Sequence, residues 1–172
     1  VQLAECPFGV MAAANLMLTP NAHTMLAVAG MTSVHGRCHT FDRGADGYAR
    51  GEAIAALVVV QRNNGRVPMP SSAVRQDGRS ASLTAPNGQA QVDLLVVTHA
   101  LVSVAADSMA LHEAHGTGTA LGDPIEAGSL AAAVLAAREA PLAVSGVKAN
   151  IGHAEPAAGM TGLLKLSLGL RS

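Results

Sequence analysis

The chain has 172 residues, a mass of 17.3 kDa and a formal net charge of 11 − 12 = −1, so it offers no basic surface for nucleic acid or an anionic membrane. Hydrophobic residues make up 49% and charged residues 13% of the chain, which excludes intrinsic disorder. Because small side chains carry most of the apolar content, we expect a tightly layered α/β interior, with much of the surface covered by protein absent from this chain.

No segment predicts a membrane span or a disulfide framework. The longest stretch without a charged residue covers 6–36, but prolines and polar residues interrupt it. The N-terminus lacks the charged start and apolar block of a signal peptide. Cys6 and Cys38 form no CxxC pair, so we expect reduced thiols and a cytoplasmic chain.

The first half of the chain predicts short apolar segments separated by loops and turns. Because the run from 53 to 60 is apolar at every position, the strand expected there should be buried on both faces. In chain order, the pattern predicts apolar segments at 9–18 and 23–30, a loop at 35–51, a strand at 53–61, a turn at 63–65, a return strand at 67–74 and a loop at 76–88.

The second half alternates helices with strands, which favours an α/β fold with a buried sheet. One helix has a clear expected start: Asp123 can cap it, Pro124 suits the first helical position and Glu126 completes a capping-box-like spacing. The expected elements are a helix over 89–104, a strand over 109–114, this helix to about 137, a strand over 141–147, a loop over 148–155 and a helix over 156–170, whose Gly159 and Gly162 allow close packing.

Seven histidines stand out in a chain this poor in aromatic residues. His23, His99 and His112 lie singly in apolar or helical contexts, where a structural or surface role is the better interpretation. His115 and His153 each follow an expected strand and lie beside glycines. Reacting groups collect at the carboxyl ends of strands in α/β folds, so these two are the functional candidates.

Three other chemistries fit the spacing poorly. His112 and His115 lack the four-residue separation of a helical metal site, and His35 with Cys38 and His39 forms no better set. The turn at 116–119 lacks the third glycine of a dinucleotide fingerprint and the Gly-Lys-Ser/Thr of a P-loop. No GxSxG nucleophile elbow occurs, which disfavours a serine hydrolase.

Two long motifs carry a family resemblance. Residues 113–126, EAHGTGTALGDPIE, and residues 147–159, VKANIGHAEPAAG, resemble the signatures around the two catalytic histidines of β-ketoacyl synthases, the condensing domains of type I modular polyketide synthases. Shorter segments at 36–42, 45–52, 76–80 and 83–88 resemble the same family in the same order, so the resemblance covers about 15–170.

The resemblance implies a thiolase-like fold, a layered αβαβα sandwich, of which this chain is mainly the later, histidine-bearing half. Residues 1–172 would then be a partial ketosynthase domain, in its C-terminal portion. The family's nucleophilic cysteine would lie upstream, and a Gly-rich segment of the oxyanion hole would lie downstream. Neither Cys6 nor Cys38 has the Ser-rich setting of that nucleophile, and Cys38 is expected to be a buried, inert thiol.

The resemblance also implies roles for five residues. His115 and His153 match the catalytic histidines, which donate hydrogen bonds to the thioester carbonyl of the extender unit, and Lys148 matches a lysine that supports them electrostatically. Thr117 and Thr119 match threonines that hydrogen-bond the phosphopantetheine arm of the substrate. Asp123 and Glu126 are interpreted as helix caps rather than site residues.

The implied activity is a decarboxylative Claisen condensation of an acyl thioester with malonyl-acyl carrier protein. A chain-initiating malonyl decarboxylase and a non-catalytic, carrier-binding domain are the alternatives. No directly bound cofactor or metal is expected. The implied partners are an acyl carrier protein with its phosphopantetheine arm, other domains of a multidomain synthase and, in the intact domain, a second copy. The chain alone is expected to be inactive.

Overall fold

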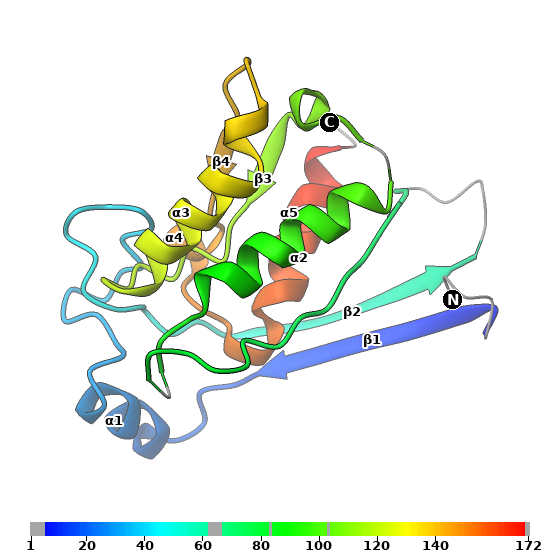
Figure 1. The fold of residues 1–172 in the computed structure, drawn as a ribbon. Coiled ribbons are helices and arrows are strands. Elements are labelled where there is room, and N and C mark those ends of the chain that lie inside the picture. The colour runs from blue at the N-terminus through cyan, green and yellow to red at the C-terminus, as the bar shows by residue number, and fades with distance from the viewer. Residues whose placement is uncertain (1–5, 62–66, 83, 103, 171–172) are drawn as a thin grey trace.

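The computed structural model describes residues 6–61, 67–82, 84–102 and 104–170. Helices and strands alternate along most of the chain, as Figure 1 shows. In chain order the elements are β1 (Phe8–Asn15), α1 (Pro20–Val28), β2 (Ala53–Val60), α2 (Gly88–Ala100), η1 (Ala106–Ser108), β3 (Leu111–Glu113), α3 (Gly122–Ala133), η2 (Leu135–Ala137), β4 (Ala143–Ser145), α4 (Lys148–Ile151), η3 (Glu155–Ala157) and α5 (Ala158–Gly169).

The strands form two separate pairs in the described part of the chain. The long strands β1 and β2 are antiparallel, with Phe8 opposite Val60 and Asn15 opposite Ala53. The short strands β3 and β4 are parallel, with Leu111 opposite Ala143. The helix α5 packs against β2 and contacts β3, and Figure 1 shows it rising at a steep angle from the β1–β2 ribbon. Because α2 packs on α3 beyond the second pair, strands and helices lie in alternating layers, as expected for a layered α/β fold.

The strand β2 is not buried on both faces, contrary to the sequence-based expectation. Its residues alternate between half-buried and exposed, and Ile54 is 73% and Val58 65% exposed. The reason is geometric. Successive side chains of a strand point to opposite faces, and among the described residues α5 packs against β2 on one face. The exposed apolar side chains of this ribbon agree with the expectation that further protein covers the chain.

Two segments have a different secondary structure from the one predicted. The return strand expected at 67–74 is irregular, because Pro68 and Pro70 have no backbone N–H to donate to a ladder. The first half of the expected loop at 148–155 is the short helix α4, and Glu155 begins the turn η3. The turn expected at 63–65 lies outside the described residues.

The other expected elements are confirmed in type, with shifted ends. The helix expected over 89–104 ends at Ala100, and the helix expected to reach 137 ends at Ala133 and continues as the turn η2. Positions 23–28 of the apolar segment at 23–30 belong to α1, whose Pro20 occupies the first helical turn. In α5, a side chain at Gly162 would contact Glu113 at 3.3 Å, but one at Gly159 would meet open space. No helix among the described residues is long and apolar enough to cross a membrane.

The buried apolar core is small and surrounds the two histidine segments. Ala114 and Ala154, which adjoin His115 and His153, are 4% and 1% exposed. The other apolar residues that are buried are Cys38, Tyr48, Leu130, Val134, Ala157 and Ala158. The best-packed part of the molecule is therefore the part that carries the candidate site.

Candidate active site

His115 and His153 lie side by side, although 38 positions separate them in the sequence. Their ring centroids are 5.5 Å apart and the rings are nearly perpendicular, at 89°. The parallel pairing of β3 with β4 explains this. His115 comes just after β3, and His153 follows β4 through the short helix α4, so both leave the same edge of the pair.

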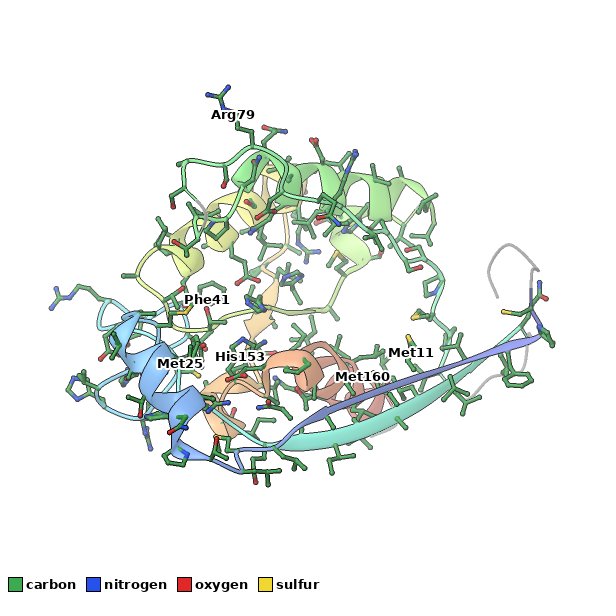
Figure 2. All side chains as sticks on the ribbon, turned by 90° about the horizontal axis from the view of Figure 1, so that it is seen from below. Met11, Met25, Phe41, Arg79, His153 and Met160 are labelled. Atoms are coloured by element: carbon green, nitrogen blue, oxygen red, sulfur yellow. The ribbon has the colours of Figure 1, made fainter. Side chains whose placement is uncertain are left out.

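The segment Tyr48–Gly51 holds His153 from one side. The His153 backbone N–H donates to the Ala49 carbonyl oxygen at 2.7 Å, and the Gly51 N–H donates to the His153 carbonyl oxygen at 2.9 Å. The Tyr48 ring lies edge-to-face against the His153 ring, with centroids 4.9 Å apart. Figure 2 shows His153 in the middle of the molecule, between the β1–β2 ribbon and the layer of α2 and α3. Its backbone and its ring are thus both fixed.

The proton on the neutral His153 ring is placed by one hydrogen bond. The Glu155 N–H donates to His153 Nδ1 at 3.1 Å, so Nδ1 is an acceptor and the ring proton resides on Nε2. Burial, followed by the nearby His115 and Lys148, lowers the pKa of His153 to about 4, although the carboxylate of Glu155 opposes the shift. At neutral pH, His153 therefore presents a neutral imidazole whose Nε2–H is free to donate.

His115 is positioned through its backbone. The N–H groups of His115 and Gly116 donate to the two carboxylate oxygens of Glu126, at 2.6 and 2.8 Å. The residue is exposed in this chain, yet enough protein surrounds the ring that burial, followed by the charge of Lys148, lowers its pKa. Like His153, it is therefore favoured in its neutral form.

The interpretation of Asp123 and Glu126 as helix caps is wrong. The Asp123 carboxylate accepts backbone N–H bonds from Phe41 (2.7 Å), Gly118 (3.0 Å) and Thr119 (3.2 Å), and it is 3% exposed. The first helical N–H of α3, that of Gly122, donates to Thr119 Oγ1 at 3.1 Å instead. Both carboxylates therefore hold the loop that carries His115, and α3 serves as the rigid base for that loop.

Lys148 is the first residue of α4 and is 4% exposed. Its Nζ donates no hydrogen bond to the described residues. Burial lowers its pKa, although the carboxylates of Glu126 and Glu113 oppose that shift. Lys148, His115 and residues of α5 line a pocket of about 300 Å³. The predicted lysine therefore lies with the predicted histidines, where its charge lowers the pKa of both.

Thr117 and Thr119 lie on the loop between His115 and α3. Their hydroxyl oxygens are 3.2 Å apart, and Thr117 is 7% exposed. Thr119 lines a second pocket, of about 440 Å³, together with Phe41, Arg43 and the start of α3. Gly118 between them has φ +79°, and a side chain there would approach the His39 nitrogen to 2.6 Å. The loop therefore follows a path that only glycine can take at this position.

Neither cysteine is placed as a nucleophile. Cys38 is 4% exposed, its Sγ accepts the Ala49 N–H at 3.2 Å, and burial raises the pKa of the thiol. Cys38 is thus buried, as expected, and a high pKa disfavours the reactive thiolate. Cys6 lies just before Phe8, at one end of β1, whereas Asn15 at the other end donates to the Gly51 carbonyl oxygen. Cys6 is therefore separated from Gly51 by the length of the strand, on the order of 20 Å at about 3.3 Å per residue.

Sequence reasoning missed the carboxylate that joins the two histidine segments. The Glu113 side chain is 5% exposed and accepts from Lys165 Nζ at 2.7 Å, Ser145 Oγ at 2.7 Å and the Val147 N–H at 2.5 Å. It therefore ties β3 to β4, to the residue before Lys148 and to α5. The ion pair of Arg50 with Glu155 was not predicted from the sequence either. No local pattern could reveal partners that lie 52 and 105 positions apart.

The described residues contain no group of three or more His, Cys, Asp or Glu side chains able to hold a metal ion. The site that the fold assembles consists of two neutral imidazoles, a buried lysine and a glycine-threonine loop. Such a set of hydrogen-bond donors suits a reaction in which negative charge develops on an oxygen atom.

Comparison with known families places both halves of the chain. Residues 69–172 match the C-terminal domain of beta-ketoacyl synthase, and residues 1–64 match its N-terminal domain. The highly reducing polyketide synthase alnA of Emericella nidulans is 38% identical over 181 residues, covering 100% of this chain and 7% of the synthase. A phenolphthiocerol/phthiocerol polyketide synthase from Mycobacterium tuberculosis is 41% identical over 177 residues, covering 98% of this chain and 8% of that protein.

Solved ketosynthases share the fold. The ketosynthase from module 6 of the bacillaene synthase of Bacillus subtilis 168 superimposes with a TM-score of 0.90 at 33% identity, covering 97% of this chain. The oxazolomycin ketosynthase domain of Streptomyces albus JA3453 gives a TM-score of 0.93 at 32% identity, covering 99% of this chain. The chain spans 31% of each of those two structures. The expected thiolase-like α/β fold is confirmed.

Proposed function

The chain belongs to the β-ketoacyl synthase family, and we propose that it is the histidine-bearing part of a ketosynthase domain in a larger polyketide synthase. The domain would join an acyl thioester to malonyl-acyl carrier protein by decarboxylative Claisen condensation. The observation that carries this proposal is the pair of neutral imidazoles, 5.5 Å apart, one with its proton fixed on Nε2.

The chemistry follows from where charge develops. The thioester carbonyl of the malonyl group would accept hydrogen bonds from His115 and His153. Cleavage of the carbon–carbon bond releases carbon dioxide and leaves the electron pair as an enolate, whose oxygen carries negative charge. Donors already placed at that oxygen stabilise the transition state more than the ground state. The acyl group would be held as a thioester on the nucleophilic cysteine. The enolate carbon then attacks the carbonyl carbon of this acyl group, and the cysteine leaves as a thiolate.

Lys148 has two effects in this scheme. Its positive charge, close to both rings, favours the developing enolate. The same charge lowers the pKa of His115 and His153, which keeps them neutral. Thr117 and Thr119 would bind the phosphopantetheine arm, and the exposure of Thr119 to the 440 Å³ pocket supports this role more directly than the burial of Thr117.

We further infer that two parts of the condensing site lie outside residues 1–172. We place the nucleophilic cysteine upstream of residue 1 and a Gly-rich segment downstream of residue 172, so the chain alone should not condense. The relatives are polyketide synthases far longer than this chain, which supports an acyl carrier protein and other synthase domains as partners. A homodimer of the intact domain and a cytoplasmic location stay predictions.

The direct test uses the intact ketosynthase, supplied with an acyl thioester and malonyl-acyl carrier protein labelled in its free carboxyl group. We expect labelled carbon dioxide and β-ketoacyl product in equal amounts. Carbon dioxide with an acetyl product and no condensation would instead indicate a chain-initiating decarboxylase. If neither product forms although the carrier binds, the domain is non-catalytic and the proposal is wrong.

The low pKa of His153 predicts an unusual pH dependence. A histidine ordinarily titrates near 6.5, whereas His153 should stay neutral down to a pH of about 4. In single turnovers of the acylated ketosynthase, the acidic limb of condensation should therefore lie well below pH 6. Replacing Lys148 by methionine removes a positive charge, so the pKa of His153 should rise and the limb should move to higher pH. A wild-type limb near 6.5, or one that Lys148→Met leaves in place, would contradict this account.

A further inference from the structure

A partly buried ion pair joins the Arg50 segment to the turn after His153. Arg50 Nε donates to Glu155 Oε1 at 2.6 Å, and Nη2 donates to Oε2 at 3.4 Å. The Arg50 side chain is 6% exposed and that of Glu155 is 24% exposed. A two-point contact between a planar guanidinium and a carboxylate fixes orientation as well as distance. The pair therefore constrains where Glu155 lies and how its backbone turns.

Glu155 has a backbone conformation that a residue with a side chain rarely adopts. Its φ is +44°, and only Phe41 shares a positive φ among the described residues other than glycine. In this left-handed region the Cβ atom crowds the following carbonyl, so the surrounding structure must hold the residue there. Among the described residues, the Glu155 side chain accepts hydrogen bonds from Arg50, and this contact can hold the residue in place.

The backbone of Glu155 determines which ring nitrogen of His153 carries the proton. Its N–H points at His153 Nδ1, 3.1 Å away, and so places the ring proton on Nε2. Because α5 is packed against β2 and β3, a Glu155 that relaxed to an ordinary φ would need a compensating rotation of the Ala154–Glu155 peptide, and that rotation would turn this N–H away. A neutral imidazole without that donor exchanges its proton between the two ring nitrogens. Only the form protonated on Nε2 would donate to the thioester carbonyl of the proposed reaction.

We propose that Arg50 is a positioning residue for condensation: its ion pair with Glu155 holds a left-handed turn whose N–H fixes the tautomer of His153. The consequence for catalysis rests on the proposed function, whereas the tautomer is a property of the fold alone. Arg50 touches no reacting atom and acts through Glu155.

The test is the tautomer of His153 in the intact ketosynthase, labelled with ¹⁵N-histidine and studied at pH 7. The wild type should show a protonated Nε2 and an unprotonated Nδ1. Arg50→Ala should give a mixture of both forms and slow condensation by roughly 10-fold to 10²-fold, the scale of a misplaced catalytic group. The control Arg79→Ala removes a guanidinium from the exposed edge of the molecule, remote from His153, and should change neither measurement (Figure 2).

A second variant separates the backbone effect from the loss of charge. Arg50→Ala/Glu155→Gly also lacks the ion pair, but glycine adopts a positive φ readily. It should regain much of the Nε2–H form and of the rate that Arg50→Ala loses. The proposal is overturned if Arg50→Ala keeps a purely Nε2-protonated His153, or if the double variant is no better than Arg50→Ala. A shifted tautomer with unchanged condensation would support the role of Arg50 and contradict the proposed function instead.

Discussion

Replacing His153 by alanine in the intact ketosynthase should slow condensation by about 10²- to 10³-fold, or ~2.7–4 kcal/mol of barrier, as for a deleted oxyanion-hole donor. The reason is that Nε2–H is aimed by the bond at Nδ1 and by the Tyr48–Gly51 segment, and alanine removes this positioned donor. Acylation of the nucleophile should continue, because that cysteine would lie outside this chain.

Single-turnover release of labelled carbon dioxide measures this effect, since it follows the step in which the enolate forms. His153→Asn keeps a donor on a shorter side chain and should lose less than His153→Ala. His23→Ala is the matched control, because His23 is exposed on α1. An unchanged rate in His153→Ala would rule out the role proposed for the histidine pair.

The second large effect is expected at Glu113, whose carboxylate joins both histidine segments. Glu113→Ala would leave the Val147 N–H without its acceptor and remove the charged partner of Lys165. A buried polar group left unpaired costs about 1–3 kcal/mol. Because β3, β4 and α5 meet at this carboxylate, we also expect His115 and Lys148 to move apart and condensation to slow.

Urea unfolding of the intact ketosynthase, measured with condensation, would check this prediction. Glu113→Gln keeps an acceptor for Val147 but turns a second donor toward Lys165, so it should lie between the wild type and Glu113→Ala. Glu139→Ala, at an exposed carboxylate, is the control. Equal midpoints for Glu113→Ala and Glu139→Ala would contradict the structural role assigned to Glu113.

The same carboxylate predicts the direction of a pH effect on stability. Burial raises the pKa of Glu113, but its bonds to Lys165, Val147 and Ser145 outweigh burial and leave the pKa below its ordinary value of 4.5. A folded-state pKa below the unfolded one means that the stabilisation is complete above the unfolded value and is lost as the pH falls through the folded pKa. His153 acts in the same sense between about 6.5 and 4, because the unfolded chain binds a proton that the folded chain does not.

Sequence reasoning located the histidines because their signals are local. His115 and His153 each lie in a continuous motif, after a strand and beside glycines, and the structure places them in contact. Most element types of the second half were also predictable, since helical spacing repeats within a few turns, but the short helix α4 was expected to be a loop. The prediction of a return strand at 67–74 was wrong for a local reason as well, because its two prolines cannot donate backbone hydrogen bonds to a neighbouring strand.

The sequence by itself determined the family, the succession of most helices and strands, and the identity of the candidate catalytic residues, since each depends on neighbouring positions. Only the tertiary structure decided what Asp123 and Glu126 do, because a carboxylate near a helix start can cap that helix or accept from a loop packed against it. It also decided which face of β2 is covered, and that Glu113 pairs with Lys165 and Arg50 with Glu155. Such contacts join segments that meet only when the chain is folded, and no periodicity or spacing along the chain encodes them.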